Sequence, residues 1–377
     1  MKFKKHKPKV LVGMSGGVDS SVAAFLLKKQ GYDVYGAFMK NWSDTKNKMT
    51  GECAWVEERK HAIKIATKLG IPFVTLDFEN AYKKLVVDEM FKKYKLGITP
   101  NPDIDCNEKI KFPLLLKAAK KAGIDFIATG HYSRIKKKKG KFELHRGKDE
   151  LKDQSYFLYR QNQNELAHTI LPIGNLTKTK VRKIARKNGF ENFDKKGTVG
   201  ICFIGKINLK NFLSKKIKPK KGKILDPEGN AIGEHDGIYF YTIGQRLGPR
   251  YGFEISRKSP NEKHVKKWYV AEKDVKKNLL IAAPEGHKIL FRKEIFVKNL
   301  HLIDEDEKTF KAKIKAKPRK VFSRIRQVGE LIPSRILLKQ NKIHVVLDKA
   351  ITGVSEGQAI VLYDKTKCLG GGVISFV

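Results

Sequence analysis

The chain has 377 residues, of which 41% are hydrophobic, so two or three domains with buried cores are expected. Lysine and arginine number 79 against 39 acidic residues; the net charge of +40 favours a polyanionic partner such as nucleic acid, although a general bias toward lysine would produce much of the same excess. No apolar stretch is long enough to span a bilayer and the basic N-terminus lacks the apolar segment of a secretory signal, which excludes a membrane span and predicts a cytoplasmic protein.

The first predicted elements are a buried strand at 10–12 and a helix that begins near residue 21, joined by a loop rich in glycine and serine. Glycines let the backbone approach a ligand closely, and the free N–H groups at a helix start bind anions. The Walker sequence is absent, and the alternative is an ordinary glycine-rich turn. The pattern resembles the pyrophosphate loop of the N-type ATP pyrophosphatases; its residues are Gly13, Met14, Ser15, Gly16, Gly17, Val18, Asp19 and Ser20.

Strands and helices then alternate up to about residue 206. Further strands are predicted at 34–39, 72–76 and 125–129, and helices at 55–69, 81–94 and 112–122, with a helical region at 163–189. This order predicts an α/β domain with a doubly wound parallel sheet. Ligands of such sheets bind at the carboxyl ends of the strands, so the loops after residues 12, 38 and 129 are expected to lie close together.

Shorter strands punctuated by glycine, proline and asparagine follow a linker at 215–223. We expect strands at 224–225, 238–241 and 268–270, and alternating strands from 289 to the end, for example at 310–316, 343–347 and 358–363. The division is therefore a catalytic domain at 1–206, a small β-rich domain at 207–288 and a β-barrel at 289–377. The lysine run at 136–139 is interpreted as a solvated hairpin tip.

The four cysteines do not suggest a disulfide framework. Cys106 follows a polar loop stiffened by prolines, at 99–105, which suggests an accessible, reactive thiol, with a structurally incidental cysteine as the alternative. Cys202, between isoleucine and phenylalanine, is by itself more typical of a small core residue, as are Cys53 and Cys368. No CxxC pair is present, so no zinc or other metal site is expected.

Taken together, the motifs resemble the bacterial tRNA-specific 2-thiouridylases over nearly the full length of the chain. The matching segments run in order through all three predicted domains, at 13–20, 38–42, 99–103 with 106–107, 128–132, 152–158, 200–205, 242–246 and 368–372. The resemblance implies ATP-dependent 2-thiolation of the wobble uridine in tRNA anticodons, by an enzyme of the N-type ATP pyrophosphatase (adenine nucleotide α-hydrolase-like) superfamily. A monomer is expected.

The resemblance also assigns roles to residues. The loop 13–20, Met39 and Gly130 would hold ATP, with Mg²⁺ expected as its companion, and the uridine oxygen would be adenylated. Cys202 would receive a persulfide from a sulfur-relay protein or a cysteine desulfurase. Cys106 would attack that persulfide, which leaves a Cys106–Cys202 disulfide, with Asp103 as a base or orienting group. An iron–sulfur cluster on Asp103, Cys106 and Cys202 stays open as an alternative.

Positions that would contact tRNA carry over in the same way. A target base must leave its stack to react, and the residues expected around it are Asn101, Pro102 and Asp103. Those expected near the anticodon are His131, Lys152, Asp153 and Gln154, and those expected in the barrel are Arg319, Lys320 and Gln358. Each of them is an ordinary surface residue without the family match. Three places depart from the family pattern: Asp105 replaces an apolar residue and disfavours a Cys106 thiolate, Lys320 replaces an aromatic residue, and the segment 197–199 differs slightly from the usual lead-in to the second cysteine.

Two other functions stay open. An ATP pyrophosphatase that adenylates a small molecule would explain the loop, but not the two placed cysteines or the basic surface. A non-catalytic RNA-binding protein with a relict nucleotide site would explain the charge, but not the intact loop.

Overall fold

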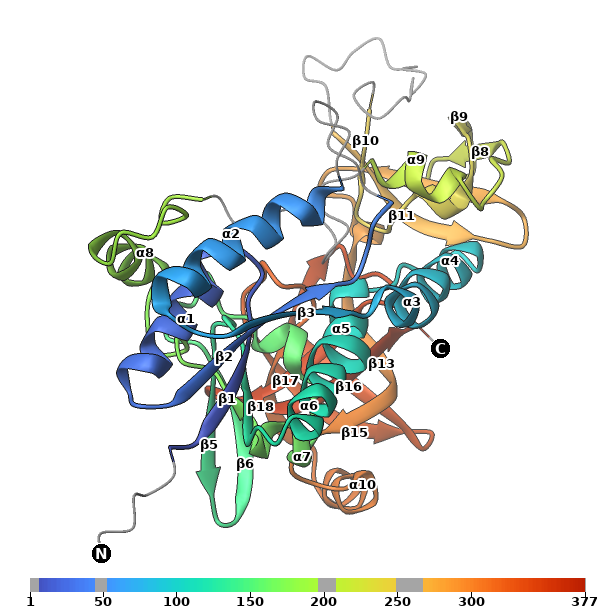
Figure 1. The fold of residues 1–377 in the computed structure, drawn as a ribbon. Coiled ribbons are helices and arrows are strands. Elements are labelled where there is room, and N and C mark those ends of the chain that lie inside the picture. The colour runs from blue at the N-terminus through green and yellow to red at the C-terminus, as the bar shows by residue number, and fades with distance from the viewer. Residues whose placement is uncertain (1–6, 45–52, 196–207, 249–266, 377) are drawn as a thin grey trace, which may run out of the picture.

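The computed structural model describes residues 7–44, 53–195, 208–248 and 267–376 (Figure 1). Its first sheet has five parallel strands in the order β3-β2-β1-β4-β7. The order reverses direction on either side of β1, as expected of a doubly wound sheet. The predicted α/β class is therefore confirmed; the strands are β1 Lys9–Gly13, β2 Asp33–Lys40, β3 Phe73–Asp77, β4 Phe126–Ala128 and β7 Thr169–Ile170.

Helices cover both faces of this sheet (Figure 1). Successive residues of a strand point to opposite faces, so neighbouring residues of β1 pack against different helices. Val10 and Val12 pack in one core with helices α1 Val18–Lys29, α2 Ala54–Leu69 and α8 Lys178–Lys187. Leu11, between them, packs in another core with helix α6 Phe112–Lys121. Both cores are apolar, so the strand has no solvated face, which explains its uninterrupted apolar sequence.

Two helical regions contain a wider π-helical turn; the first was predicted at 81–94, whereas the second begins at Pro102, before the helix predicted at 112–122. The first is α3 Glu79–Tyr82, η1 Lys83–Val87 and α4 Asp88–Lys95; the second is α5 Pro102–Cys106, η2 Asn107–Lys111 and α6. Turns of this kind are frequent at functional sites. The second one begins directly after Cys106. Other short helices are η3 Ser155–Leu158 and α7 Gln163–Ala167.

The middle of the chain forms a second five-stranded sheet, in the order β10-β11-β12-β8-β9. The predicted strand at 238–241 is wrong: it is a single 3-10 turn, η4 Ile238–Phe240, because Ile238 and Phe240 bury themselves against Phe212 rather than pair with a neighbouring strand. The elements here are α9 Leu209–Ser214, β8 Gly222–Leu225, β9 Ala231–His235, β10 Arg246–Leu247, β11 Trp268–Asp274, β12 Leu279–Pro284 and η6 Lys288–Leu290.

The last part of the chain is the expected barrel. Its strands pair in the order β13-β16-β15-β14-β17-β18, and β13 also pairs with β18, which closes the sheet around a core that includes Ile336, Val345 and Ile360. The strands are β13 Phe291–Leu302, β14 Arg319–Arg324, β15 Ile332–Lys339, β16 Lys342–Thr352, β17 Ala359–Asp364 and β18 Lys367–Ser375.

A hairpin from the first part of the chain extends the barrel sheet. Strands β5 Ser133–Lys138 and β6 Lys141–Arg146 pair with each other, and β6 pairs with β18 through Leu144 and Cys368. The hairpin turns at Lys139 and Gly140, both exposed and both with positive φ (48° and 78°), as the lysine run predicts. The first and last parts of the molecule are thus joined by backbone hydrogen bonds.

The predicted strand at 310–316 is also wrong: these residues belong to a helix, α10 Glu307–Ala316. Alternation of Phe310, Ala312, Ile314 and Ala316 suggests a strand, but Phe310 and Ile314 are also one helical turn apart, and both are buried. Asp306 caps the helix by accepting a hydrogen bond from the Thr309 amide at 2.8 Å. Across the described ranges, no helix is long and apolar enough to cross a membrane.

Candidate functional site

The glycine-rich loop joins β1 to the start of α1, as predicted. Gly17 is the N-cap residue of α1. Because glycine has no side chain, no N-cap side chain accepts a hydrogen bond from the first amides of the helix. Gly16 has φ +77°, a conformation that favours glycine. The Ser20 and Ser21 hydroxyls both donate to the Gly17 carbonyl at 3.0 Å and brace the turn. A helix start with this geometry binds an anion such as phosphate.

Two other strand ends meet this loop. A Cβ atom on Gly130, after β4, would lie 2.6 Å from the Ser20 amide nitrogen, so only glycine permits this approach. A Cβ on Gly13 would lie 3.4 Å from the Met39 methyl, at the end of β2. The expected convergence of these loops is therefore confirmed.

Asp19, in the first turn of α1, is held by two residues that the sequence did not single out. Both Asp19 carboxylate oxygens accept hydrogen bonds from Lys178 Nζ at 2.7 Å, and one also accepts from the Tyr132 hydroxyl at 2.7 Å. Burial, followed by the charge of Asp19, raises the pKa of Tyr132, so this hydroxyl stays a donor. Lys178 is the first residue of α8, and it places a positive charge beside the anion-binding helix start.

A third unforeseen residue locks the loop from behind. The Asn192 side-chain amide, 3% exposed, donates to the Gly16 carbonyl and the Ser21 hydroxyl, each at 3.0 Å. A Cβ on Gly16 would meet the Glu58 carbonyl of α2 at 2.2 Å. The loop is thus rigid before any ligand binds.

Cys106 ends helix α5 and is 0% exposed. The predicted accessible thiol on a loop is therefore wrong. Asn101 caps the helix by accepting from the Ile104 amide at 3.3 Å, and Pro102 stands at the first helical position, where its fixed φ suits a helix. The thiol then packs in the core that holds Trp42, Phe91 and Phe212.

The carboxylate next to Cys106 is neutralised. Asp105 Oδ2 lies 3.2 Å from Lys93 Nζ, and Asp105 Oδ1 lies 3.0 Å from Lys109 Nζ. The expected penalty of Asp105 on a Cys106 thiolate is therefore opposed by two ammonium groups. Asp103, on the same helix, is half-buried. Cys202 lies outside the described residues, and among those described no three His, Cys, Asp or Glu side chains are grouped to hold a metal ion.

In the segment at 152–154 Lys152 is exposed, Asp153 is buried and Gln154 is half-buried. Lys152 is exposed, whereas the Asp153 side chain is 0% exposed and pairs with Arg324 Nη1 of β14 at 2.7 Å. Gln154 Oε1 accepts from the Tyr132 amide at 3.0 Å. Asp153 and Gln154 are thus engaged in internal contacts. The ion pair could not be predicted from local sequence, because Arg324 is 171 positions from Asp153.

His131 is 8% exposed and its Nδ1 lies 2.7 Å from the Thr129 hydroxyl. Burial, followed by the charge of Lys111, holds the pKa of His131 well below its usual value, so the ring is neutral at pH 7. A neutral imidazole binds by hydrogen bonding or stacking rather than by charge.

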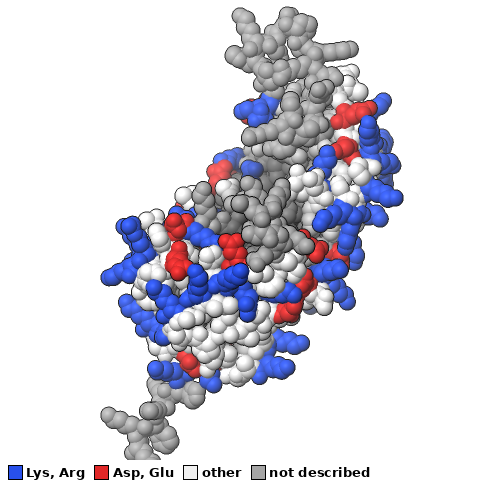
Figure 2. All heavy atoms as spheres, turned by 45° about the horizontal axis from the view of Figure 1, so that its top comes forward, with Lys and Arg blue, Asp and Glu red and all other residues white. Residues whose placement is uncertain are grey.

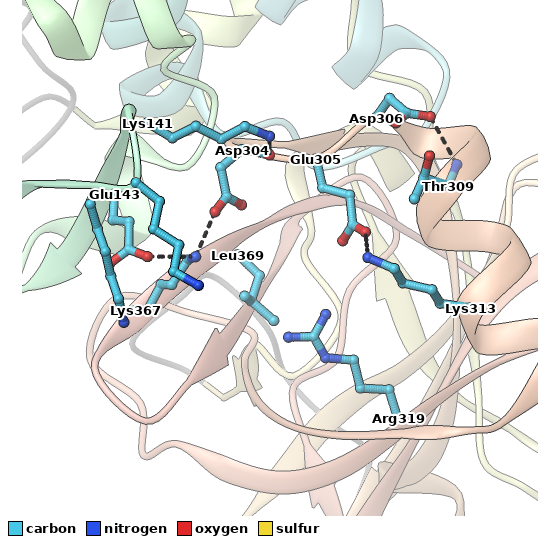
Figure 3. Close-up of a pocket in the computed structure, with 12 residues that line it drawn as sticks. Lys141, Glu143, Asp304, Glu305, Asp306, Thr309, Lys313, Arg319, Lys367 and Leu369 are labelled. Carbon is cyan, nitrogen blue, oxygen red and sulfur yellow. Dashed lines mark hydrogen bonds and ion pairs between the residues drawn. The ribbon is translucent and has the colours of Figure 1, made fainter.

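Arg319 and Lys320 are not brought to this region. They start β14, whereas Arg324 ends it, so Arg319 and Arg324 are roughly 17 Å apart along the strand. Arg319 lines a separate pocket of about 610 Å³ between the β5–β6 hairpin and α10. Figure 3 shows this pocket to be of mixed charge, with Lys367 bonded to Glu143 and Asp304. Gln358 does meet the region, because its side chain bonds the loop before α5.

Charge alone does not single out a site on the face of the molecule seen in Figure 2. Figure 2 shows lysine and arginine over much of the visible surface, interrupted by groups of acidic residues. The net charge of +40 therefore favours a polyanion in general. The site that could act on one must be identified from the loop and the helix described above.

Comparisons with known proteins agree with this arrangement. Three family models match in succession: a tRNA methyl transferase HUP domain at 8–206, a tRNA methyl transferase PRC-barrel domain at 210–284, and an aminomethyltransferase beta-barrel domain at 292–374. Among solved structures, a 4-thiouridine synthetase–RNA complex with bound ATP matches 55% of this chain and 50% of its own at 14% identity and a TM-score of 0.34.

Curated relatives match over almost the whole chain. The tRNA-specific 2-thiouridylase MnmA 1 of Geobacillus kaustophilus (strain HTA426) is 41% identical, covering 98% of this chain and 96% of its own. That of Coxiella burnetii (strain Dugway 5J108-111) is 42% identical, covering 97% and 98%. That of Listeria monocytogenes serovar 1/2a (strain ATCC BAA-679 / EGD-e) is 40% identical, covering 98% and 95%. The chain therefore belongs to the family of tRNA-specific 2-thiouridylases.

Proposed function

We propose that this protein is a tRNA-uridine 2-sulfurtransferase, which adenylates the C2 oxygen of the wobble uridine with ATP and replaces that oxygen by sulfur. The proposal rests on the edge of the first sheet, where the anion-binding loop from Gly13 to Ser20 lies against Gly130. The chain is also about 40% identical to proteins named tRNA-specific 2-thiouridylase. We also propose that the reaction takes place in the cytoplasm, since tRNA is the proposed substrate. We keep the division at 1–206, 207–288 and 289–377 as part of this proposal.

The first step activates a poor leaving group. A carbonyl oxygen of uracil does not leave readily, whereas AMP formed on that oxygen does. The loop amides would hold the phosphates, and Met39 and Gly130 would frame the nucleotide. Asp19 is the type of carboxylate that binds Mg²⁺ together with phosphate oxygens, and Mg²⁺ bound with ATP would neutralise phosphate charge. Lys178, which donates a hydrogen bond to Asp19, lies beside the proposed phosphate site, where its positive charge would attract the pyrophosphate.

The second step delivers sulfur. Cys202 would carry a persulfide supplied by a sulfur-relay protein or cysteine desulfurase. The Cys106 thiolate attacks the inner sulfur of that persulfide, forms the Cys106–Cys202 disulfide and expels hydrosulfide, which adds to C2 of the adenylated uridine and displaces AMP. In the alternative course the terminal persulfide sulfur attacks C2 and displaces AMP while still bonded to Cys202, and Cys106 then attacks Cys202 Sγ, which forms the disulfide and releases 2-thiouridine. A thiol reductant then restores both cysteines, and Asp103 would orient or deprotonate the reacting groups.

Recognition of tRNA would place the flipped base against Asn101, Pro102 and Asp103 at the start of α5. Lys152 is exposed, which suits a phosphate contact, and the neutral His131 suits a contact with a base. Arg326 is also exposed, and a Cβ on Gly353 would lie 3.3 Å from its Nη1. Arg326 lies two residues beyond Arg324, at the Asp153 end of β14, and it replaces Arg319 in our account of the barrel's RNA contact.

The test is a single-turnover reaction with ATP, Mg²⁺, unmodified tRNA and a persulfide donor, followed by mass spectrometry of nucleosides and of cysteine peptides. Wild type should form 2-thiouridine and the Cys106–Cys202 disulfide. Cys202→Ser should release pyrophosphate but accept no sulfur, and Cys106→Ser should load Cys202 and then stall. Full thiolation by either variant would exclude this sulfur route.

The same assay separates the rival functions. Pyrophosphate release with a small acceptor and no tRNA would indicate another ATP pyrophosphatase. Binding of tRNA without ATP binding would indicate a non-catalytic protein. The matched family models carry a methyl-transfer description; appearance of a methylated uridine in place of 2-thiouridine would support that reading against ours.

A further inference from the structure

Gln358 joins the barrel to the segment that precedes the cysteine helix. Its side-chain Nε2 donates to the Thr99 carbonyl at 3.1 Å and to the Pro100 carbonyl at 2.9 Å, and its Oε1 accepts from Asn101 Nδ2 at 3.3 Å. These bonds use both amide hydrogens and one of the two lone pairs of the amide oxygen. A side chain engaged in this way has little left to offer an external RNA.

The same short segment is held at further points. The Thr99 amide donates to the Glu356 carbonyl at 3.3 Å. The barrel segment 356–358 therefore binds Thr99 and Pro100 through both its backbone and the Gln358 side chain. A Cβ on Gly357 would lie 2.1 Å from Ile98 Cγ2, so the two segments approach as closely as glycine allows. Thr99 is only 6% exposed, so this contact, called the Thr99 joint below, is a buried interface between the two segments.

The middle domain reaches the same residue through the motif at 242–246, which the reaction scheme does not use. The Thr99 hydroxyl donates to the Thr242 hydroxyl at 3.3 Å. The Thr242 amide in turn donates to Gln245 Oε1 at 3.0 Å, which stiffens the turn. A Cβ on Gly244 would meet the Gly353 Cα of the barrel at 2.5 Å. All three parts of the chain therefore meet at Thr99.

The joint bears directly on the reactive cysteine. Asn101, bonded to Gln358, is also the N-cap of α5, and the five residues from Pro102 to Cys106 form that helix. The helix continues through η2 into α6, so the cap at Asn101 sets the position of its first residues. A shift of Asn101 therefore shifts Asp103 and Cys106 together.

We propose that Gln358 is a positioning residue: it fixes the helix of Cys106 through residues 99–101, and Thr242 supports it from the middle domain. The expected effect on the thiolation rate rests on the proposed function, whereas the expected effect on the position of the Cys106 helix does not. It replaces the expected direct contact of Gln358 with tRNA by a contact inside the protein.

The first test needs neither tRNA nor ATP. Gln358→Leu removes all three bonds, and Gln358→Glu sets a carboxylate against two carbonyl oxygens. We expect either change to speed labelling of buried Cys106 by N-ethylmaleimide about tenfold, read by peptide mass spectrometry. Cys368 is an internal control, because it too is 0% exposed but lies in β18. Thr242→Val, which removes one bond, should give a smaller rise on Cys106.

The second test separates positioning from RNA contact. Gln358→Leu should lower kcat for thiolation about tenfold while KM and Kd for tRNA stay within about twofold. A weaker Kd with unchanged kcat and unchanged Cys106 labelling would overturn the proposal in favour of RNA contact. An equal rise on Cys106 and Cys368 would also overturn it, because the effect would then be on the whole fold. If wild type fails to thiolate tRNA, the proposed function falls, while the labelling result still decides the role of Gln358.

Discussion

Asp153 and Arg324 form a buried ion pair that ties the loop before η3 to the end of barrel strand β14. Arg324 Nη1 lies 2.7 Å from Asp153 Oδ2, and the side chains are 3% and 0% exposed. The Gly147 amide and the Ser155 hydroxyl also donate to the Asp153 carboxylate, at 2.9 and 3.0 Å. A charge pair this enclosed costs desolvation, and it is favourable only with such additional donors.

Asp153→Asn should therefore destabilise the protein by about 3 kcal/mol, because it leaves the Arg324 charge buried without its counter-ion. The midpoint of urea unfolding measures this. The double variant Asp153→Asn/Arg324→Met should recover part of the loss. If Asp153→Asn unfolds at the wild-type midpoint but binds tRNA poorly, Asp153 contacts RNA instead.

The neighbouring Lys152 provides the matched contrast, since it is exposed. Lys152→Gln should leave the unfolding midpoint unchanged and weaken tRNA binding. It should also reduce the slope of log Kd against log salt by about 0.7 to 0.9, the value expected for one lost phosphate contact. A binding curve that does not change with salt in wild type would show that the basic charge does not recognise RNA.

Asp19→Asn should abolish pyrophosphate release and leave tRNA affinity unchanged. Asp19 lies in the first turn of α1 and holds Lys178 beside the anion site, so the change removes a carboxylate and releases a lysine there. Because this pair is partly exposed, the stability loss should be only about 1 kcal/mol. Asp33→Asn, at the opposite end of the sheet in β2, is the control and should release pyrophosphate normally. Normal release from Asp19→Asn would remove the loop from the mechanism.

The barrel offers a second comparison, between two arginines. Arg326→Gln should weaken tRNA binding roughly fivefold at low salt, as expected for one charge-assisted contact, because Arg326 is exposed beside Gly353, near the Thr99 joint. Arg319→Gln should leave binding unchanged, since Arg319 lies at the other end of β14 beside α10. Equal losses in fluorescence titrations would mean that RNA covers both ends of the strand.

Three features of the fold were predicted correctly from local sequence patterns. The loop of 13–20, the order of strands and helices in the first sheet and the closed barrel follow from glycine placement and apolar periodicity, and all three are present. The helix at Glu307–Ala316 was missed because its alternation suits either element, and only the Asp306 cap separates them.

Features that depend on distant residues could not be predicted in this way. Cys106 is buried in a core that gathers residues distant in sequence, from Trp42 to Phe212 of the following domain, rather than by its polar neighbours. Asp153 and Gln358 are polar residues that the sequence suggests are at the surface, but their partners, Arg324 and Thr99, are 171 and 259 positions away. Lys178 gave no signal for the nucleotide site, because only the packing of α8 on α1 brings it to Asp19.

The half-buried Lys273, which lies near the contact between the three parts of the chain at Thr99, makes a prediction about pH. Lys273, in β11, donates to the Tyr241 carbonyl at 2.8 Å, directly before Thr242. Burial lowers the pKa of Lys273 to about 8, and the charge of Glu356 opposes this only in part. In the unfolded chain the same group titrates near its ordinary value of 10.5.

The sign of the effect follows from proton binding. At pH values below 8 both states carry the proton, so this group adds no pH dependence. As pH rises above 8 the folded state loses its proton first, and since the unfolded state then binds more protons, stability increases with pH. Wild type should therefore gain about 2 kcal/mol relative to Lys273→Met between about pH 8 and about pH 9.5. Urea midpoints of the two proteins at both pH values measure the difference, and parallel pH profiles would show that Lys273 has an ordinary pKa.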